Sequence, residues 1–113
     1  MLQDWKTLVQ NGGAAIGMLA KGNGGIMQGI GALGKAEEAK GSLDKKTREL
    51  IALAVAATTR CDTCIAIHAS EAVKAGATRD ELLEALAVAV SLNAGAALVY
   101  SSRILEAYDQ FTQ

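Results

Sequence analysis

The amino-acid sequence predicts an all-α protein, and two features of its composition carry this prediction. The 113 residues include no proline, so no helix interior contains the residue that cannot donate a backbone hydrogen bond. Half of the residues are hydrophobic, and alanine and leucine, which are abundant, are among the strongest helix formers. The length corresponds to one domain, residues 1–113, which we divide into a glycine-rich N-terminal part, 1–41, and a core, 42–113.

The net charge and the apolar runs of the sequence limit which classes of partner we expect. The formal net charge is −1, no basic patch is visible, and four aromatic residues are too few for base stacking, so we expect no nucleic-acid partner. The N-terminus, MLQDWKTLVQ, lacks the positive cluster and apolar core of a signal peptide. The longest apolar run, 82–99, is interrupted by Glu84, Ser91 and Asn93, which argues against a transmembrane helix. We therefore expect a cytoplasmic protein with no membrane partner.

The N-terminal part is predicted to form two helices, 4–20 and 23–39. Nine of the twelve glycines lie between Gly12 and Gly34, and because glycine lowers helix stability, this region needs tertiary contacts. Its GIGALGKA stretch approximates two phosphate-binding motifs, but both require a preceding strand and a βαβ unit, which the sequence does not predict. We interpret these glycines as positions of close helix approach or of a flexible connection, and we expect no nucleotide cofactor.

The core is predicted to begin with two shorter helices. The first covers residues 44–59, with Ser42 or Asp44 as its N-cap, and its apolar second half is expected to be buried. The second covers 61–75 and begins at Cys61 or Asp62. Gly76 can end it in the left-handed conformation.

The last helix is predicted to run to about Phe111. It opens on TRDE, in which Thr78 and Glu81 fit a capping box, and Asn-Ala-Gly at 93–95 suggests a kink. The stretch LLEALAVAVSLNAGAALVY is apolar around most of its circumference, and such a helix is normally covered on all sides. We expect a homo-oligomer that buries it between subunits; the alternative is a central helix in a compact bundle.

Both cysteines and the single histidine lie within eight positions, in TTRCDTCIAIHASEAV. On a helix, Cys61, Cys64 and His68 share one face, because they are three and four residues apart. His68 follows Cys64 by one turn, so its ring can reach that sulfur directly or through a water. The start of the helix supplies unpaired N–H groups and a positive dipole end, which favour thiolate over thiol. The cluster therefore predicts reactive thiolate chemistry.

Glu49 is the candidate that would orient His68. It lies 12 residues before Cys61, about 18 Å away along a straight helix, so it can meet His68 only if the chain turns at 58–61. Two helices folded against each other would then form a relay, in which Glu49 holds His68 and His68 withdraws the proton from Cys64.

Other interpretations of these residues remain open at this point. Glu49 could be an exposed residue that pairs with Lys45 or Lys46, because carboxylates are seldom buried without a partner. The two cysteines, the histidine and the glutamate could instead supply four ligands to a zinc ion. The cysteines could also be small buried residues without chemistry.

The stretch ELIALAVAATTRCDTCIAIHASEAVKAGATRDELLEAL resembles the AhpD-like alkylhydroperoxidase branch of the carboxymuconolactone decarboxylase superfamily. The pattern is a glutamate, a Cys-x-x-Cys twelve residues later, and a histidine four residues after the second cysteine; it is matched by Glu49, Cys61, Cys64 and His68. The resemblance covers roughly residues 43–111. It implies an AhpD-like helical bundle that forms homo-oligomers, often trimers or hexamers, and thiol-dependent peroxidase activity without a metal or other cofactor.

The resemblance also implies a role for each residue. Cys64 would be the thiolate that attacks the hydroperoxide substrate, and Cys61 would resolve the sulfenic acid into a Cys61–Cys64 disulfide. An external dithiol or thiol protein would then reduce the disulfide, and His68 and Glu49 would form the proton relay. One position departs from the pattern: Thr63 stands where the better-studied enzymes carry a second histidine. This departure bears on the strength of the activity and on the choice of reductant.

Two other functions are compatible with the sequence. Decarboxylases of the same superfamily act on a lactone acid, but they do not use this cysteine pair. A non-catalytic helical oligomer could use the pair to sense redox state or to bind zinc.

Overall fold

The computed structural model describes residues 2–112, and over this range the protein is all-α, as predicted. The described residues form five helices and no strand. In chain order the helices are α1 (Trp5–Gly22), α2 (Gly24–Glu38), α3 (Lys45–Thr59), α4 (Asp62–Lys74) and α5 (Arg79–Phe111). The two phosphate-loop-like motifs lie inside α2, with helix before them and no strand, so their structural context is absent from the described chain.

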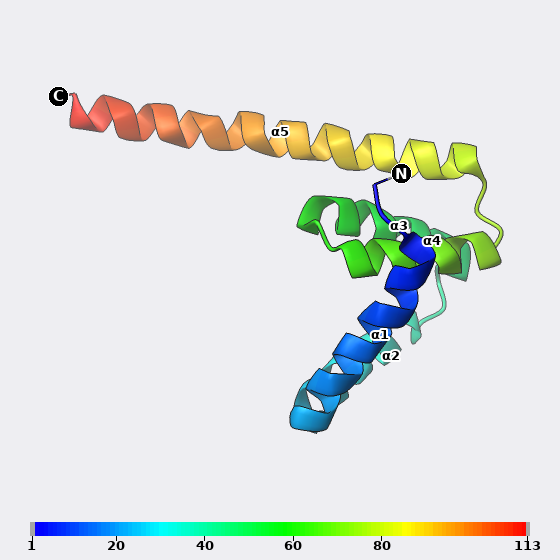
Figure 1. Ribbon diagram of the computed structural model, residues 1–113. Coiled ribbons are helices and arrows are strands. Elements are labelled where there is room, and N and C mark those ends of the chain that lie inside the picture. Colours follow the sequence, from blue (N-terminus) through cyan, green and yellow to red (C-terminus); the bar gives the residue numbers. More distant parts are fainter. Residues whose placement is uncertain (1, 113) are drawn as a thin grey trace.

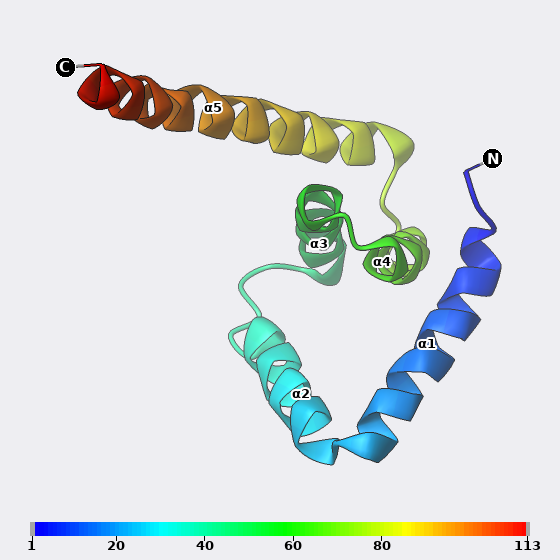
Figure 2. The same cartoon turned by 60° about the vertical axis from the view of Figure 1, so that its left-hand side comes forward.

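The helices form a central pair with two extensions. Helices α3 and α4 run side by side in opposite directions, and α5 packs on α3 and continues far beyond it (Figure 1). On the other side, α1 packs on α4 and α2 packs on α1, so that α1 and α2 form a V-shaped arm (Figure 2). The α3–α4 pair, which we call the hairpin, is therefore the centre of the molecule, on which α1 and α5 pack directly.

Local capping decides where the core helices begin and end. The Asp44 carboxylate accepts a hydrogen bond from the backbone N–H of Thr47 at 2.8 Å, which makes Asp44 the N-cap of α3. Thr78 and Glu81 form the predicted capping box of α5. Gly76, after α4, has a φ of 85°, a conformation that residues with a side chain seldom adopt. These boundaries confirm the predicted helices to within about two residues.

The turn between α3 and α4 reverses the chain in two residues. Arg60 is in the left-handed conformation, with φ 56° and ψ 46°, and its backbone N–H bonds to the carbonyl oxygen of Ala56. Cys61 follows as the N-cap of α4, and its Sγ accepts a hydrogen bond from the Cys64 backbone N–H at 3.2 Å. This reversal brings the two helices of the hairpin face to face.

The buried core of one chain is small and lies in the hairpin. Its buried hydrophobic residues are Leu53 and Ala56 of α3 and Ala66 and Ala72 of α4. The expectation that the second half of α3 is buried is therefore only half right, because other side chains of that segment, such as Val55, remain exposed.

Gly12 is the glycine at which two helices approach closely. It is buried in α1, and a Cβ built on it would lie 2.5 Å from Cγ2 of Thr63 in α4. The other glycines of α1 lie in open space, so close packing accounts for one of the glycines in this helix.

Helix α5 is continuous, so the predicted kink at 93–95 is wrong. The Asn93 side chain donates to the carbonyl oxygen of Ala89 at 2.8 Å, within the same helix, and to Oγ1 of Thr58 in α3 at 2.9 Å. Both bonds are made without a break in the helix.

No residue of Arg79–Phe111 is buried within the chain. In length and composition α5 meets the criteria for a helix that crosses a membrane. The core helix of a soluble protein can meet the same criteria.

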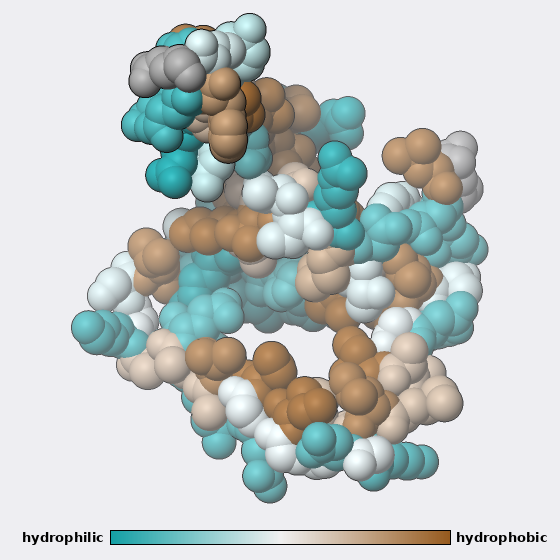
Figure 3. All heavy atoms as spheres, turned by 90° about the vertical axis from the view of Figure 1, so that its left-hand side faces the viewer, coloured by the Kyte–Doolittle hydropathy of each residue, from teal (hydrophilic) through white to brown (hydrophobic). Residues whose placement is uncertain are grey.

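The single chain exposes more surface than a folded monomer of its size. Its accessible surface is 8851 Å², against about 5,800 Å² expected for a monomeric protein of this mass. Its radius of gyration is 18.3 Å, compared with about 13 Å for a compact domain of 100 residues. In Figure 3 an opening separates the V-shaped arm from the hairpin, and apolar side chains lie along its edge.

Candidate active site

The structure brings Glu49 of α3 against His68 of α4. Glu49 Oε2 lies 2.6 Å from Nδ1 of His68, although the residues are 19 positions apart in the chain. The Glu49 side chain is only 12% exposed, so the contact is shielded from water on the glutamate side. The hairpin thus produces the proximity that the sequence could predict only on condition that the chain turned near Thr58–Cys61.

The lysines near Glu49 have other partners. Lys45 Nζ lies 2.8 Å from the carboxylate of Glu71, and Lys46 Nζ lies 2.8 Å from that of Glu81. The alternative that Glu49 is an exposed residue paired with one of these lysines is therefore wrong. The reason is tertiary: α4 and α5 present carboxylates to the two lysines, while Glu49 faces the inside of the hairpin.

The contact with Glu49 determines how His68 can act. An ionised carboxylate can only accept hydrogen bonds, so beside ionised Glu49 the Nδ1–H group of His68 donates a hydrogen bond to Oε2. In the neutral imidazole the other nitrogen, Nε2, is then the acceptor. The ring is oriented by its partner and offers Nε2 as a base, which is the arrangement that general base catalysis requires.

The two cysteines form a disulfide at the start of α4. Their Cα atoms are 5.2 Å apart, within the ordinary range for a disulfide. Cys61 is the N-cap and Cys64 lies in the first turn, so both sulfurs are near the N-terminus of the helix. In the reduced protein this position favours the thiolate of either residue, because it lies at the positive end of the helix dipole.

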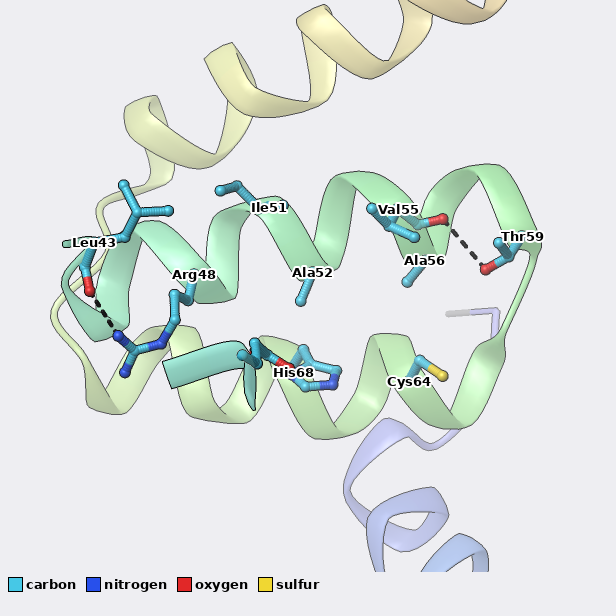
Figure 4. A pocket seen from close by; sticks show the side chains of 10 residues that line it. Leu43, Arg48, Ile51, Ala52, Val55, Ala56, Thr59, Cys64 and His68 are labelled. Atoms are coloured by element: carbon cyan, nitrogen blue, oxygen red, sulfur yellow. Dashed lines mark hydrogen bonds between the residues drawn. The ribbon is translucent and has the colours of Figure 1, made fainter. Parts of the chain in front are cut away.

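A cavity of about 440 Å³ connects the sulfur of Cys64 with the histidine. Its walls come mainly from α3 and α4, and Figure 4 shows Cys64 and His68 projecting from α4 toward α3. Such a volume suits a small organic molecule. The lining residues are Glu37, Leu43, Arg48, Ile51, Ala52, Val55, Ala56, Thr59, Cys64 and His68.

Arg48 is a lining residue that sequence reasoning missed. Its Nη1 donates a hydrogen bond to the carbonyl oxygen of Leu43 at 2.6 Å. This bond holds the guanidinium beside the N-terminal end of α3 (Figure 4). The signal was present: Arg48, Ala52 and Ala56 recur every four residues and so share one face of the helix. Without the position of α4, nothing distinguished that face from the others.

Thr63 lies outside the cavity. It is absent from the cavity wall and packs against Gly12 of α1, where no space is left for a glycine side chain. The position that departs from the pattern of the better-studied enzymes therefore lies where α1 docks on α4.

The described residues give the zinc interpretation no support. Between residues 2 and 112, no three side chains of His, Cys, Asp or Glu are grouped so that they could hold a metal ion.

The fold belongs to a known family. Residues 25–107 match the model of the carboxymuconolactone decarboxylase family, and the chain is a member of that family. The apo crystal structure of a carboxymuconolactone decarboxylase family protein from Legionella pneumophila is similar to it, with a TM-score of 0.72 and 37% identity, over 96% of this chain and 97% of that one.

Two relatives are similar over most of their length. An uncharacterized protein of Haemophilus influenzae is 54% identical over 96% of both chains. Uncharacterized protein 4 in the cox locus of Paracoccus denitrificans is 39% identical, over 86% of this chain and 87% of its own. Family membership and the all-α fold are thus confirmed, and assignment to the AhpD-like branch stays a prediction.

Proposed function

We propose that this protein is a thiol-dependent hydroperoxide reductase in which Cys61 and Cys64 alternate between dithiol and disulfide. One observation carries the proposal: Cys64 and His68 line the same cavity, while Glu49 holds the far side of the histidine ring. The disulfide between Cys61 and Cys64 at the start of α4 supports the second requirement, that the two sulfurs bond to each other.

The first step oxidises Cys64. His68 Nε2 takes the proton of the Cys64 thiol, and the thiolate attacks the hydroxyl oxygen of the hydroperoxide ROOH. The S–O bond forms as the O–O bond breaks, so that two electrons pass from sulfur to the peroxide. Cys64 becomes a sulfenic acid, and the leaving alkoxide takes the proton from His68 and departs as the alcohol ROH.

The second step forms the disulfide. The Cys61 sulfur attacks the sulfenic sulfur of Cys64, and the hydroxyl group leaves with the proton of Cys61 as water. An external dithiol then restores both thiols by thiol–disulfide exchange and becomes a disulfide itself. In sum, one hydroperoxide and one dithiol give an alcohol, water and a disulfide.

The division of roles follows from position. Cys64 lines the cavity with His68, whereas Cys61 is not part of the cavity wall and serves as the N-cap of α4. A hydroperoxide in the cavity therefore meets Cys64 first. The presence of a cysteine pair beside the histidine favours this redox reaction over the decarboxylation that the family name describes.

The test begins with the reduced protein. After removal of the reductant, one equivalent of cumene hydroperoxide is added, free thiols are trapped over time, and intact mass is measured. We expect prompt loss of both thiols in the wild type, no reaction in Cys64→Ser, and a sulfenic acid that dimedone captures in Cys61→Ser. Steady turnover with dithiothreitol distinguishes a reductase from a sensor that is oxidised once. Thiols that stay free in the wild type would contradict the proposal.

We further propose that the protein acts as a homo-oligomer in the cytoplasm, with a dithiol or thiol protein as reductant. The support is the exposed surface: its total area is about 3,000 Å² larger than a monomer of this mass exposes, which is the scale of an obligate interface, and many large aliphatic side chains are exposed on it. Helices α3 and α5 also border a groove of about 600 Å³, whose walls are mostly aliphatic. A trimer or hexamer is the expectation that the family resemblance supplies.

A further inference from the structure

We propose that Arg48 selects hydroperoxides that carry a carboxylate at the far end of an apolar chain, such as fatty acid hydroperoxides. This inference rests on the proposed function and names its class of substrate. It follows from the contents of the cavity described above, which has the reacting sulfur and a cation at opposite ends.

The distance between the two ends is set by α3. Arg48 and Ala56 share one face of the helix and are eight residues apart, about 12 Å along its axis. Cys64 of α4 lies opposite the Ala56 end, and Arg48 lies at the other end (Figure 4). The wall between them combines aliphatic side chains, including Ile51 and Val55, with the imidazole of His68. A molecule that spans the cavity therefore meets sulfur, then imidazole and hydrocarbon, then guanidinium.

The Arg48 guanidinium is held in place and has donors to spare. One of its five N–H groups bonds to the carbonyl oxygen of Leu43. Within residues 2–112 no carboxylate lies within ion-pair distance of Arg48, whereas Lys45 and Lys46 both have carboxylate partners. A planar guanidinium with free N–H groups is suited to a carboxylate, which it can bind through two parallel hydrogen bonds.

Glu37 is the acidic residue that faces the same cavity. It lies near the end of α2, is exposed, and does not form an ion pair with Arg48 in the described chain. Its negative charge would repel a bound carboxylate and compete for Arg48. Removal of this charge should therefore act in the opposite direction to removal of Arg48.

The test compares one hydroperoxide in two charge states. Linoleic acid hydroperoxide and its methyl ester are assayed below their micelle concentrations with dithiothreitol as reductant, and cumene hydroperoxide serves as a small neutral reference. We expect the wild type to prefer the acid, and Arg48→Gln to lower the acid-to-ester ratio of kcat/KM about tenfold or more. Arg48→Lys, which keeps the charge without the planar fork, should lower this ratio less. Glu37→Gln should raise the ratio.

The controls separate two kinds of failure. Circular dichroism of Arg48→Gln and trapping of its two reduced thiols show that its fold and its thiols are intact, and comparison of acid with ester in the same variant removes any general change in activity. If the wild type reduces cumene hydroperoxide but treats acid and ester alike, or if Arg48→Gln slows both equally, the role of Arg48 is overturned while the proposed function stands. If the wild type reduces none of the three, the proposed function fails and this inference fails with it.

Discussion

The hairpin and α5 are both rich in aliphatic residues, but only the hairpin buries some of them within the chain. The hairpin contains the four buried aliphatic side chains of the core, the disulfide and the Glu49–His68 contact. Helix α5 is longer and richer in aliphatic residues, yet none of its residues is buried within the chain. The hairpin holds the buried core of the single chain, whereas α5 presents an apolar surface that is covered only in part, where it packs on α3.

This contrast links the proposed reaction to the hairpin and the expected assembly to α5. Every residue proposed to react lies on α3, on α4 or, for Cys61, at the N-cap of α4, in contacts that one chain makes by itself. The apolar surface of α5 would be costly in water, since each Å² of buried apolar surface contributes about 25 cal/mol. We therefore expect that variants of α5 affect assembly first and variants of the hairpin affect the reaction first.

The largest effect is expected from charges on the exposed apolar surface of α5. Val90 and Leu98 are 70% and 76% exposed in the single chain. If a second copy covers them, the double variant Val90→Glu/Leu98→Glu should dissociate the oligomer, because buried charges without partners are strongly unfavourable. Light scattering after size-exclusion chromatography measures the mass. Gln110→Glu, which adds a charge near the end of α5, is the matched control and should leave assembly unchanged. A wild type that is monomeric would contradict the expected assembly.

Next in size is the effect of Glu49→Gln on the reaction. The amide keeps the shape of the side chain but removes the charge that holds and stabilises a protonated His68. We expect the rate of Cys64 oxidation by cumene hydroperoxide to fall about a hundredfold, within the range that general acid–base groups contribute. Stopped-flow trapping of the thiols measures this rate. Glu71→Gln removes a carboxylate that pairs with Lys45 at the surface and should leave the rate unchanged. If Cys64 is oxidised as fast in Glu49→Gln as in Glu71→Gln, Glu49 has no role in the mechanism.

A smaller effect is expected where α1 meets α4. Gly12→Ala would place a methyl group 2.5 Å from Thr63 Cγ2, and such overpacking costs about 1–3 kcal/mol. Gly13→Ala adds the same methyl group in open space and should stabilise α1 by about 0.5–1 kcal/mol. Urea unfolding of the two variants should therefore change in opposite directions. Adding Thr63→Ser, which removes the crowded methyl group, should restore stability to Gly12→Ala; a loss that persists would refute the packing explanation.

The smallest effect is expected from the surface pair of Lys45 and Glu71. The hydrogen bond and charge of Lys45 hold the pKa of Glu71 below its ordinary value, which is about 4.3. The ion pair of Lys45 and Glu71 therefore stabilises the folded protein above that pH. This stabilisation is lost as the pH falls through the lowered pKa of Glu71. We expect Lys45→Met to cause a slight loss of melting temperature at neutral pH and none once Glu71 is protonated. A deficit that is the same at both pH values would show that the lost interaction is not the ion pair.

Much of the fold could be predicted because its signals are local. The N-cap Asp44, the capping box of Thr78 and Glu81, and the left-handed Gly76 act within a few residues of the helix ends that they define. The grouping of Cys61, Cys64 and His68 on one face of a helix is likewise a property of helical spacing alone. The kink predicted near Asn93 failed because a hydrogen bond to Thr58, in another helix, provides a partner for that side chain without a break in α5.

What the sequence by itself determined is the set of helices and the grouping of Cys61, Cys64 and His68 at the start and along one face of α4. Only the tertiary structure decided which residue supports that cluster, because Glu49 reaches His68 through a reversal at Arg60, a residue whose left-handed conformation no local propensity signals. The same reversal placed Arg48 in the cavity with Cys64 and left Thr63 against Gly12. Short-range hydrogen bonds act between residues that the sequence shows as neighbours, whereas these contacts depend on the path of the chain between distant residues.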